Sequence, residues 1–98
     1  MAGGSVFERM LRRFRDHVRR GDYLLTIHAD EEMDADELTG FDVEAAILNG
    51  QVVERQRDHA TREAKYVVRG KGLDGQRIGV VAKISPTGRM VVVTVYRG

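Results

Sequence analysis

The sequence has no cysteine and no tryptophan, and its single proline is Pro86. The lack of cysteine excludes disulfide bridges, thiolate catalysis and cysteine-based zinc sites, and it agrees with a reducing cytoplasm, where we expect this protein. No apolar run approaches the roughly 20 residues that a membrane-spanning helix needs. Charged residues interrupt the apolar ones near the start, so we expect no signal peptide and no membrane partner.

Lysine and arginine are also missing from a long stretch of the chain. Residues 22–46 carry nine acidic residues and no Lys or Arg, whereas residues 1–20 carry six Arg against two acids and residues 51–98 carry ten bases against four acids. Either the acidic helices dock beside basic elements of the same chain, or a basic surface is left to bind a polyanion. Both interpretations stay open at this point.

A length of 98 residues suits one modest hydrophobic core, so we predict a single domain over residues 1–98. Residues 1–4 should be a disordered tail. Ser5 followed by Glu8 makes a capping box, which predicts an amphipathic, basic helix over residues 5–20. The apolar side of that helix consists of residues at helical spacing, namely Phe7, Met10, Leu11, Phe14 and Val18.

A short extended segment, Tyr23 to Ile27, should lead into a second helix over about residues 28–37. Thr39 can cap a third, short helix that Asn49 and Gly50 close. His28 lies at the first of these junctions. Histidine is the side chain whose ordinary pKa lies near neutrality, so we expect any chemistry to lie near it, although it can equally serve as a helix cap.

From Gln51 onward the pattern changes to strands separated by turns. Asp74-Gly75 is the pair that tight hairpins favour, because both central residues can take positive φ. Residues 85–88 supply a second turn, and the valine-rich residues 90–96 form the last strand. We therefore predict an α+β fold, with N-terminal helices packed on one face of an antiparallel sheet of about four strands.

The sequence has no phosphate loop, dinucleotide fingerprint or HExxH motif, and no third ligand joins His28 and its neighbouring acids, so we expect no metal and no cofactor. Metal-free RNA cleavage needs less, because RNA supplies its own 2′-hydroxyl nucleophile. The protein must then move protons and stabilise the charged phosphorane. The candidate catalytic residues are His28, Arg69 and Lys83.

Further residues are candidates for contacts with RNA. Basic side chains can bind phosphates and tyrosines can stack on bases. This candidate RNA-binding set consists of Arg55, Arg57, Lys65, Tyr66, Arg77 and Tyr96. The alternative is that the tyrosines are half-buried sheet residues and the basic residues are solvated, while His17 and His59 are bystanders.

Blocks of residues over about Asp22 to Tyr96 resemble the domain of unknown function 4258 family of small bacterial and archaeal proteins. The blocks are Thr26-Ile27-His28-Ala29, Met33, Val43 to Ile47, Gly50, Tyr66 to Gly70, Asp74-Gly75, Val80-Val81 and Val93 to Tyr96. The resemblance implies a fold similar to bacterial toxins of the RelE and MqsR kind, which are ribonucleases that a partner antitoxin neutralises. His28 is the matching polar position.

Two positions depart from this family pattern. Asp34 follows Met33 where many members carry an arginine, and Gly79 precedes Val80 where many carry a histidine. Two hypotheses follow: a toxin-like ribonuclease or RNA-binding domain, and a non-catalytic module that docks a partner protein through its acidic helices or its sheet. A homodimer through the last strand is a further expectation if the edge of that strand is unpaired.

Overall fold

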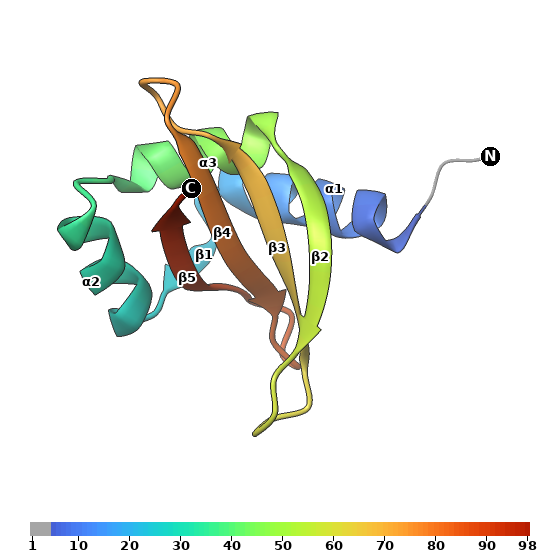
Figure 1. The fold of residues 1–98 in the computed structure, drawn as a ribbon. Coiled ribbons are helices and arrows are strands. Elements are labelled where there is room, and N and C mark those ends of the chain that lie inside the picture. Colours follow the sequence, from blue (N-terminus) through green and yellow to red (C-terminus); the bar gives the residue numbers. More distant parts are fainter. Residues whose placement is uncertain (1–4) are drawn as a thin grey trace.

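The computed structural model describes residues 5–98, and within them it has three helices and a five-stranded mixed sheet (Figure 1). The predicted α+β class is confirmed. Residues 1–4, expected as a tail, lie outside the described residues. The elements in chain order are α1 Val6–Arg19, β1 Tyr23–Leu25, α2 Ile27–Ala35, α3 Gly40–Asn49, β2 Gln51–Arg57, β3 Ala64–Lys71, β4 Arg77–Ile84 and β5 Met90–Arg97.

The strand order in the sheet is β1-β5-β4-β3-β2, and β1 runs parallel to β5 while the other neighbours are antiparallel. The prediction of about four antiparallel strands was therefore wrong in both number and direction. Strand β1 has three residues and pairs Tyr23 with Met90, a partner that no local pattern reports. Strand β5 lies inside the strand order, but β1 pairs only with its first three residues, so a dimer through the last strand stays a prediction.

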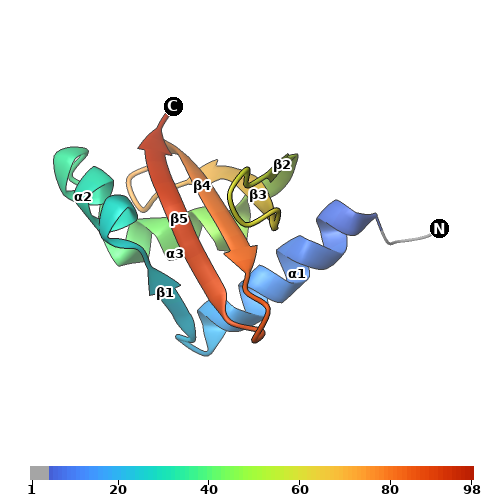
Figure 2. The same cartoon turned by 90° about the horizontal axis from the view of Figure 1, so that it is seen from below.

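Helices α1 and α3 lie on one face of the sheet, as predicted, whereas α2 lies beside β1 and β5 (Figures 1 and 2). The Thr26 N–H donates to the carbonyl of Val92 at 3.0 Å, and the Val95 N–H donates to Glu32 Oε1 at 3.0 Å. Helix α2 thereby covers the part of β5 that extends past β1, where a strand edge would otherwise carry unpaired groups.

The core lies between the sheet and the pair α1 and α3. Helix α3 approaches β3 so closely that a Cβ at Gly70 would clash with the main-chain oxygen of Ala46. A glycine is therefore required at this contact. The fully buried large side chains of the core come from helices and strands alike, among them Phe14, Val43, Ile47, Val68, Ile78, Val80, Met90, Val92 and Val95.

Local signals in the sequence correctly predict the N-terminal ends of α1 and α3 and the turn at residues 85–88. The capping box of Ser5 and Glu8 is present, and Thr39 with Asp42 forms a second one at α3. The Asp74-Gly75 turn differs from the expectation, because Gly75 takes positive φ and Asp74 does not. None of the helices within residues 5–98 has the length and apolar character needed to cross a bilayer.

Candidate anion-binding groove

The β3–β4 hairpin lies at one end of the sheet (Figure 1). A groove of about 640 Å³ opens beside the strands of this hairpin. Three of its lining side chains are cationic: Arg69 and Lys71 from β3, and Arg77 from the start of β4. None of the side chains that line the groove is acidic. The complete lining is Asn49, Gly50, Gln51, Arg69, Gly70, Lys71, Arg77, Ile78 and Gly98. We call this space the basic groove.

The hairpin register explains why the three cations meet. Arg69 and Lys71 are two residues apart on β3, so both side chains leave the same face of the sheet. Lys71 is paired directly with Arg77 across the hairpin. Like charges in directly opposite positions are destabilising, and a bound anion would relieve that repulsion. The arrangement is therefore electrostatically suited to a phosphate or carboxylate group.

The walls of the basic groove are held by main-chain contacts. The Asn49 amide donates to the Lys71 carbonyl at 2.8 Å and accepts from the Lys71 N–H at 2.9 Å. Arg69 Nη1 donates to the Gly98 main-chain oxygen at 3.4 Å. A Cβ at Gly50 would clash with the main-chain oxygens of Ala46 and Arg69, so helix and strand meet here without side chains between them. The cationic side chains thus emerge from a rigid backbone frame.

Tyr96 lies next to the groove, on the face of the sheet that α1 and α3 leave open. Its ring packs over Gly79, its cross-strand partner, and the Arg69 guanidinium carbon lies 6.0 Å from the ring centroid. That distance is within the range of a cation–π contact. The tyrosine ring therefore fills the space into which a side chain at position 79 would project.

His28 lies outside the basic groove. Its side chain is 66 % exposed, and its Nε2 atom lies 3.3 Å from Glu32 Oε2. Since Glu32 also accepts the Val95 N–H, the carboxylate joins the imidazole to the edge of β5. None of the residues that line the basic groove comes from α2.

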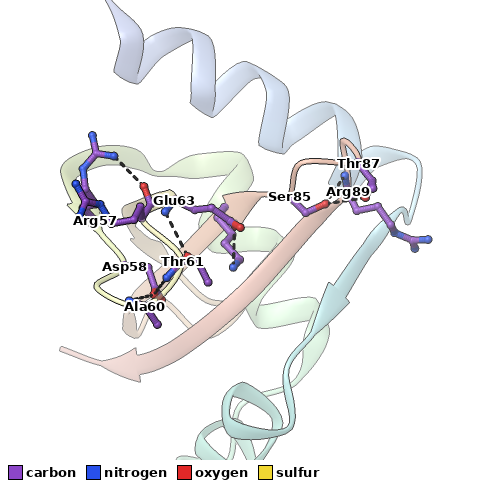
Figure 3. A network of polar contacts seen from close by, with 10 residues as sticks. Arg57, Asp58, Ala60, Thr61, Glu63, Ser85, Thr87 and Arg89 are labelled. Carbon is purple, nitrogen blue, oxygen red and sulfur yellow. Dashed lines mark hydrogen bonds and ion pairs between the residues drawn. The ribbon is translucent and has the colours of Figure 1, made fainter.

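The predicted catalytic set is not brought together. Lys83 lies near the opposite end of β4, where its Nζ atom is 3.0 Å from Glu63 Oε1. Glu63 is the last residue of the β2–β3 loop, which Figure 3 shows. Arg69 pairs with Gly79, four residues before Lys83, which separates them by roughly 13 Å along the strand. Of the three candidates, only Arg69 lines the basic groove, while His28 and Lys83 lie elsewhere.

The predicted RNA-binding residues are also spread over the molecule. Arg77 lines the groove and Tyr96 adjoins it, whereas Arg55 and Arg57 lie in the second half of β2. Arg57 Nη1 donates to the Arg62 carbonyl at 2.8 Å and supports the loop shown in Figure 3. Lys65 is half-buried on β3, opposite Gln56.

The proposed stacking role of Tyr66 does not agree with its position. Its side chain is 6 % exposed and packs edge-on against the rings of Phe7 and Phe14. The ring faces the core because β3 presents Tyr66 and Val68 to the helices and Arg69 to the opposite face. Only a small part of the ring is left exposed for a base to contact.

Sequence reasoning missed Lys71 and Asn49. The signal for Lys71 was present in its spacing of two from Arg69 and in the hairpin that sets it opposite Arg77. Asn49 gave no such signal, because its bonds to Lys71 span 22 residues. Within residues 5–98, no group of three or more His, Asp or Glu side chains is arranged to hold a metal ion.

A comparison with models of protein families shows to which family the chain belongs. The family model described as Domain of unknown function (DUF4258) matches residues 25–97. The chain belongs to the DUF4258 family. The matched DUF4258 segment contains every residue that lines the basic groove except Gly98, and it excludes α1. No curated protein and no solved structure matches the chain, so the likeness to toxins of the RelE kind stays a prediction.

Proposed function

We propose that this DUF4258 domain binds single-stranded RNA, with a phosphodiester held in the basic groove. The observation that carries the proposal is the convergence of Arg69, Lys71 and Arg77 on one open groove that no acidic side chain lines. Cationic side chains that meet phosphates release counterions and dominate the affinity of proteins for nucleic acids.

The surroundings of the groove favour a single strand of RNA. Tyr96 stands beside Arg69 on the open sheet face, where an unpaired base can stack against the exposed part of the ring or the guanidinium plane. The exposed amide of Gln51 borders the same groove and can exchange hydrogen bonds with a 2′-hydroxyl. Such a contact separates RNA from DNA.

Binding without cleavage is the form of the proposal that the geometry supports. Cleavage needs a proton donor and acceptor beside the phosphate, and the lining of the basic groove includes no histidine, aspartate or glutamate. A toxin-like ribonuclease that uses His28 would need the RNA to extend from the groove across β4 and β5 to α2. The prediction is that a labelled RNA incubated with the protein stays intact while it is bound.

The test is fluorescence anisotropy of a labelled single-stranded RNA over a range of salt concentrations. The double variant Arg69→Gln/Arg77→Gln should lower the affinity at least about tenfold at low salt, and should reduce the slope of log K against log salt by about 1.4. The control Arg13→Gln/Arg20→Gln removes the same charge from exposed positions outside the groove. Equal losses in both variants would refute a site in the groove.

A second candidate is a protein-interaction module, and the exposed apolar residues of α3 favour it. Phe41 is 70 % exposed, and exposed Leu48 follows seven residues later on the same side of the helix. A partner such as an antitoxin protein or a second copy of this chain would cover them. Sedimentation velocity tests the second copy: a dimer that Phe41→Ser weakens supports this candidate, and a monomer at all concentrations argues against self-association.

A further inference from the structure

A second groove, of about 310 Å³, lies between α1 and the start of β2. It contains three arginines, Arg12, Arg15 and Arg19, and one acid, Glu8. Its lining is Glu8, Leu11, Arg12, Arg15, Arg19 and Gln51. Gln51 also lines the basic groove. The two grooves therefore meet at the first residue of β2, and between them they are lined by six cationic side chains.

We infer that this α1 groove is a second RNA-binding site, and that one RNA strand runs from the basic groove past Gln51 onto α1. The inference rests on the proposed function. Arg12 and Arg19 are exposed and lie two turns apart, about 10 Å along the same side of α1. Two such charges can contact successive parts of an extended strand.

Arg15 neutralises main-chain carbonyls that lie between the two grooves. Its Nε donates to the Ile47 carbonyl at 3.1 Å and its Nη2 donates to the Gly50 carbonyl at 3.0 Å. These carbonyls lie at the C-terminus of α3, which carries a partial negative charge that would repel a phosphate. Because Arg15 covers them with a guanidinium, a strand that passes Gln51 meets positive rather than negative charge.

The acidic side chains around the α1 groove determine where a favourable path for the RNA strand ends. Glu8 is held in the capping box at the start of α1, where its Oε1 accepts the Ser5 N–H at 3.3 Å. Asp16 lies 3.7 Å from Arg19, but both side chains are more than half exposed, so the pair is weak and an RNA phosphate can compete for the arginine. The favourable path therefore ends before the first turn of α1.

Since α1 precedes the segment that matches DUF4258, this second site is an addition to the family domain. It predicts that affinity depends on RNA length. A strand of about 4 nucleotides should fill the basic groove alone, and one of about 12 should also reach Arg12 and Arg19. Salt dependence reports the number of phosphates contacted, at about 0.7 per phosphate for a single strand.

The experiment compares Arg12→Gln/Arg19→Gln with Arg13→Gln/Arg20→Gln by anisotropy with both RNA lengths. The control pair has the same spacing and charge change, with Arg13 in α1 and Arg20 at its C-cap, but neither residue lines the α1 groove. We expect the slope of log K against log salt to fall by about 1.4 for the first variant on the long RNA. The control pair, and the short RNA with either variant, should keep the wild-type slope.

Equal slopes for the two double variants on the long RNA would overturn the inference. If Arg69→Gln/Arg77→Gln still loses binding in that experiment, the proposed function stands without the α1 site. Absence of binding by the wild-type protein to either RNA would overturn both. Thermal unfolding of each variant, with the midpoint unchanged, shows that a lost slope comes from lost contacts and not from lost fold.

Discussion

At the scale of single residues, the side chain of Asp42 links two segments that lie far apart in the sequence, which no local pattern indicates. This buried carboxylate accepts the N–H groups of Thr39 at 2.9 Å and Leu73 at 2.8 Å, so it caps α3 and also holds the β3–β4 hairpin. These main-chain hydrogen bonds lower the pKa of Asp42 below its ordinary value of 3.8. The basic groove is lined by the strands of that hairpin, so Asp42 supports it indirectly.

The lowered pKa of Asp42 predicts how stability depends on pH. Its contribution is complete above the unfolded-state pKa of about 3.8 and is lost as the pH falls through the lower folded-state value. Asp42→Asn should cost about 1–3 kcal/mol at pH 7, because an amide cannot accept both N–H groups as the carboxylate does. Urea unfolding between pH 7 and pH 3 measures both effects.

The control for Asp42 is Asp74→Asn, which makes the same charge change at an exposed position in the hairpin turn. It should leave the unfolding free energy at pH 7 within about 0.5 kcal/mol of wild type. A loss of stability on acidification that is equally steep in Asp42→Asn and in wild type would show that other carboxylates cause it.

Glu37 is held in the left-handed backbone region, with φ of 57°. The Leu38 N–H donates to the Met33 carbonyl and the Glu37 N–H to that of Asp34, so Glu37 occupies the position at the end of α2 that glycine prefers. Glu37→Gly should raise the unfolding free energy by about 1 kcal/mol. Glu37→Gln keeps the backbone strain and removes only the charge. A gain as large in this control as in glycine would assign the effect to charge.

At the scale of elements, the strand pair β4–β5 depends on the fit of the Tyr96 ring over Gly79. Gly79→Ala should destabilise the protein by about 1–3 kcal/mol, because the added Cβ overlaps the ring and the ring must move. In a Tyr96→Ala background the same change should cost much less. Chemical denaturation of the four proteins gives the coupling energy. A coupling of zero would mean that the ring does not occupy this space in solution.

The elements that the sequence predicts are those whose signals are local. The capping boxes of α1 and α3 and the strands β3, β4 and β5 each depend on residues close together in the chain. The parallel pairing of β1 with β5 and the position of α2 depend on contacts across more than 60 residues. For the same reason Arg69 and Arg77 could be named from the sequence, whereas their separation from His28 could not.

At the scale of the whole molecule, acidic and basic residues serve different purposes. Within the acidic segment, Glu32 accepts a main-chain N–H of β5 and Asp42 accepts one from the β3–β4 turn. Asp22 Oδ1 lies 3.9 Å from Arg89 Nη2, and Asp22 Oδ2 lies 3.4 Å from His17 Nδ1. The cations around Gln51 line two open grooves instead. The net charge is only +1, but acidic and basic side chains lie in different parts of the molecule. Such a separation of charge orients an approaching polyanion.

The last prediction concerns whether α1, which lies outside the family match, belongs to the cooperative fold. Phe14 of α1 is fully buried and contacts Tyr66 of β3, so Phe14→Ala should cost about 3–5 kcal/mol. Phe41→Ala removes the same atoms from an exposed site and should change the unfolding free energy by less than about 1 kcal/mol. Both are measured by urea denaturation followed by circular dichroism. If Phe14→Ala unfolds at the wild-type midpoint, α1 is an appendage, and its arginines cannot be held in register with the basic groove.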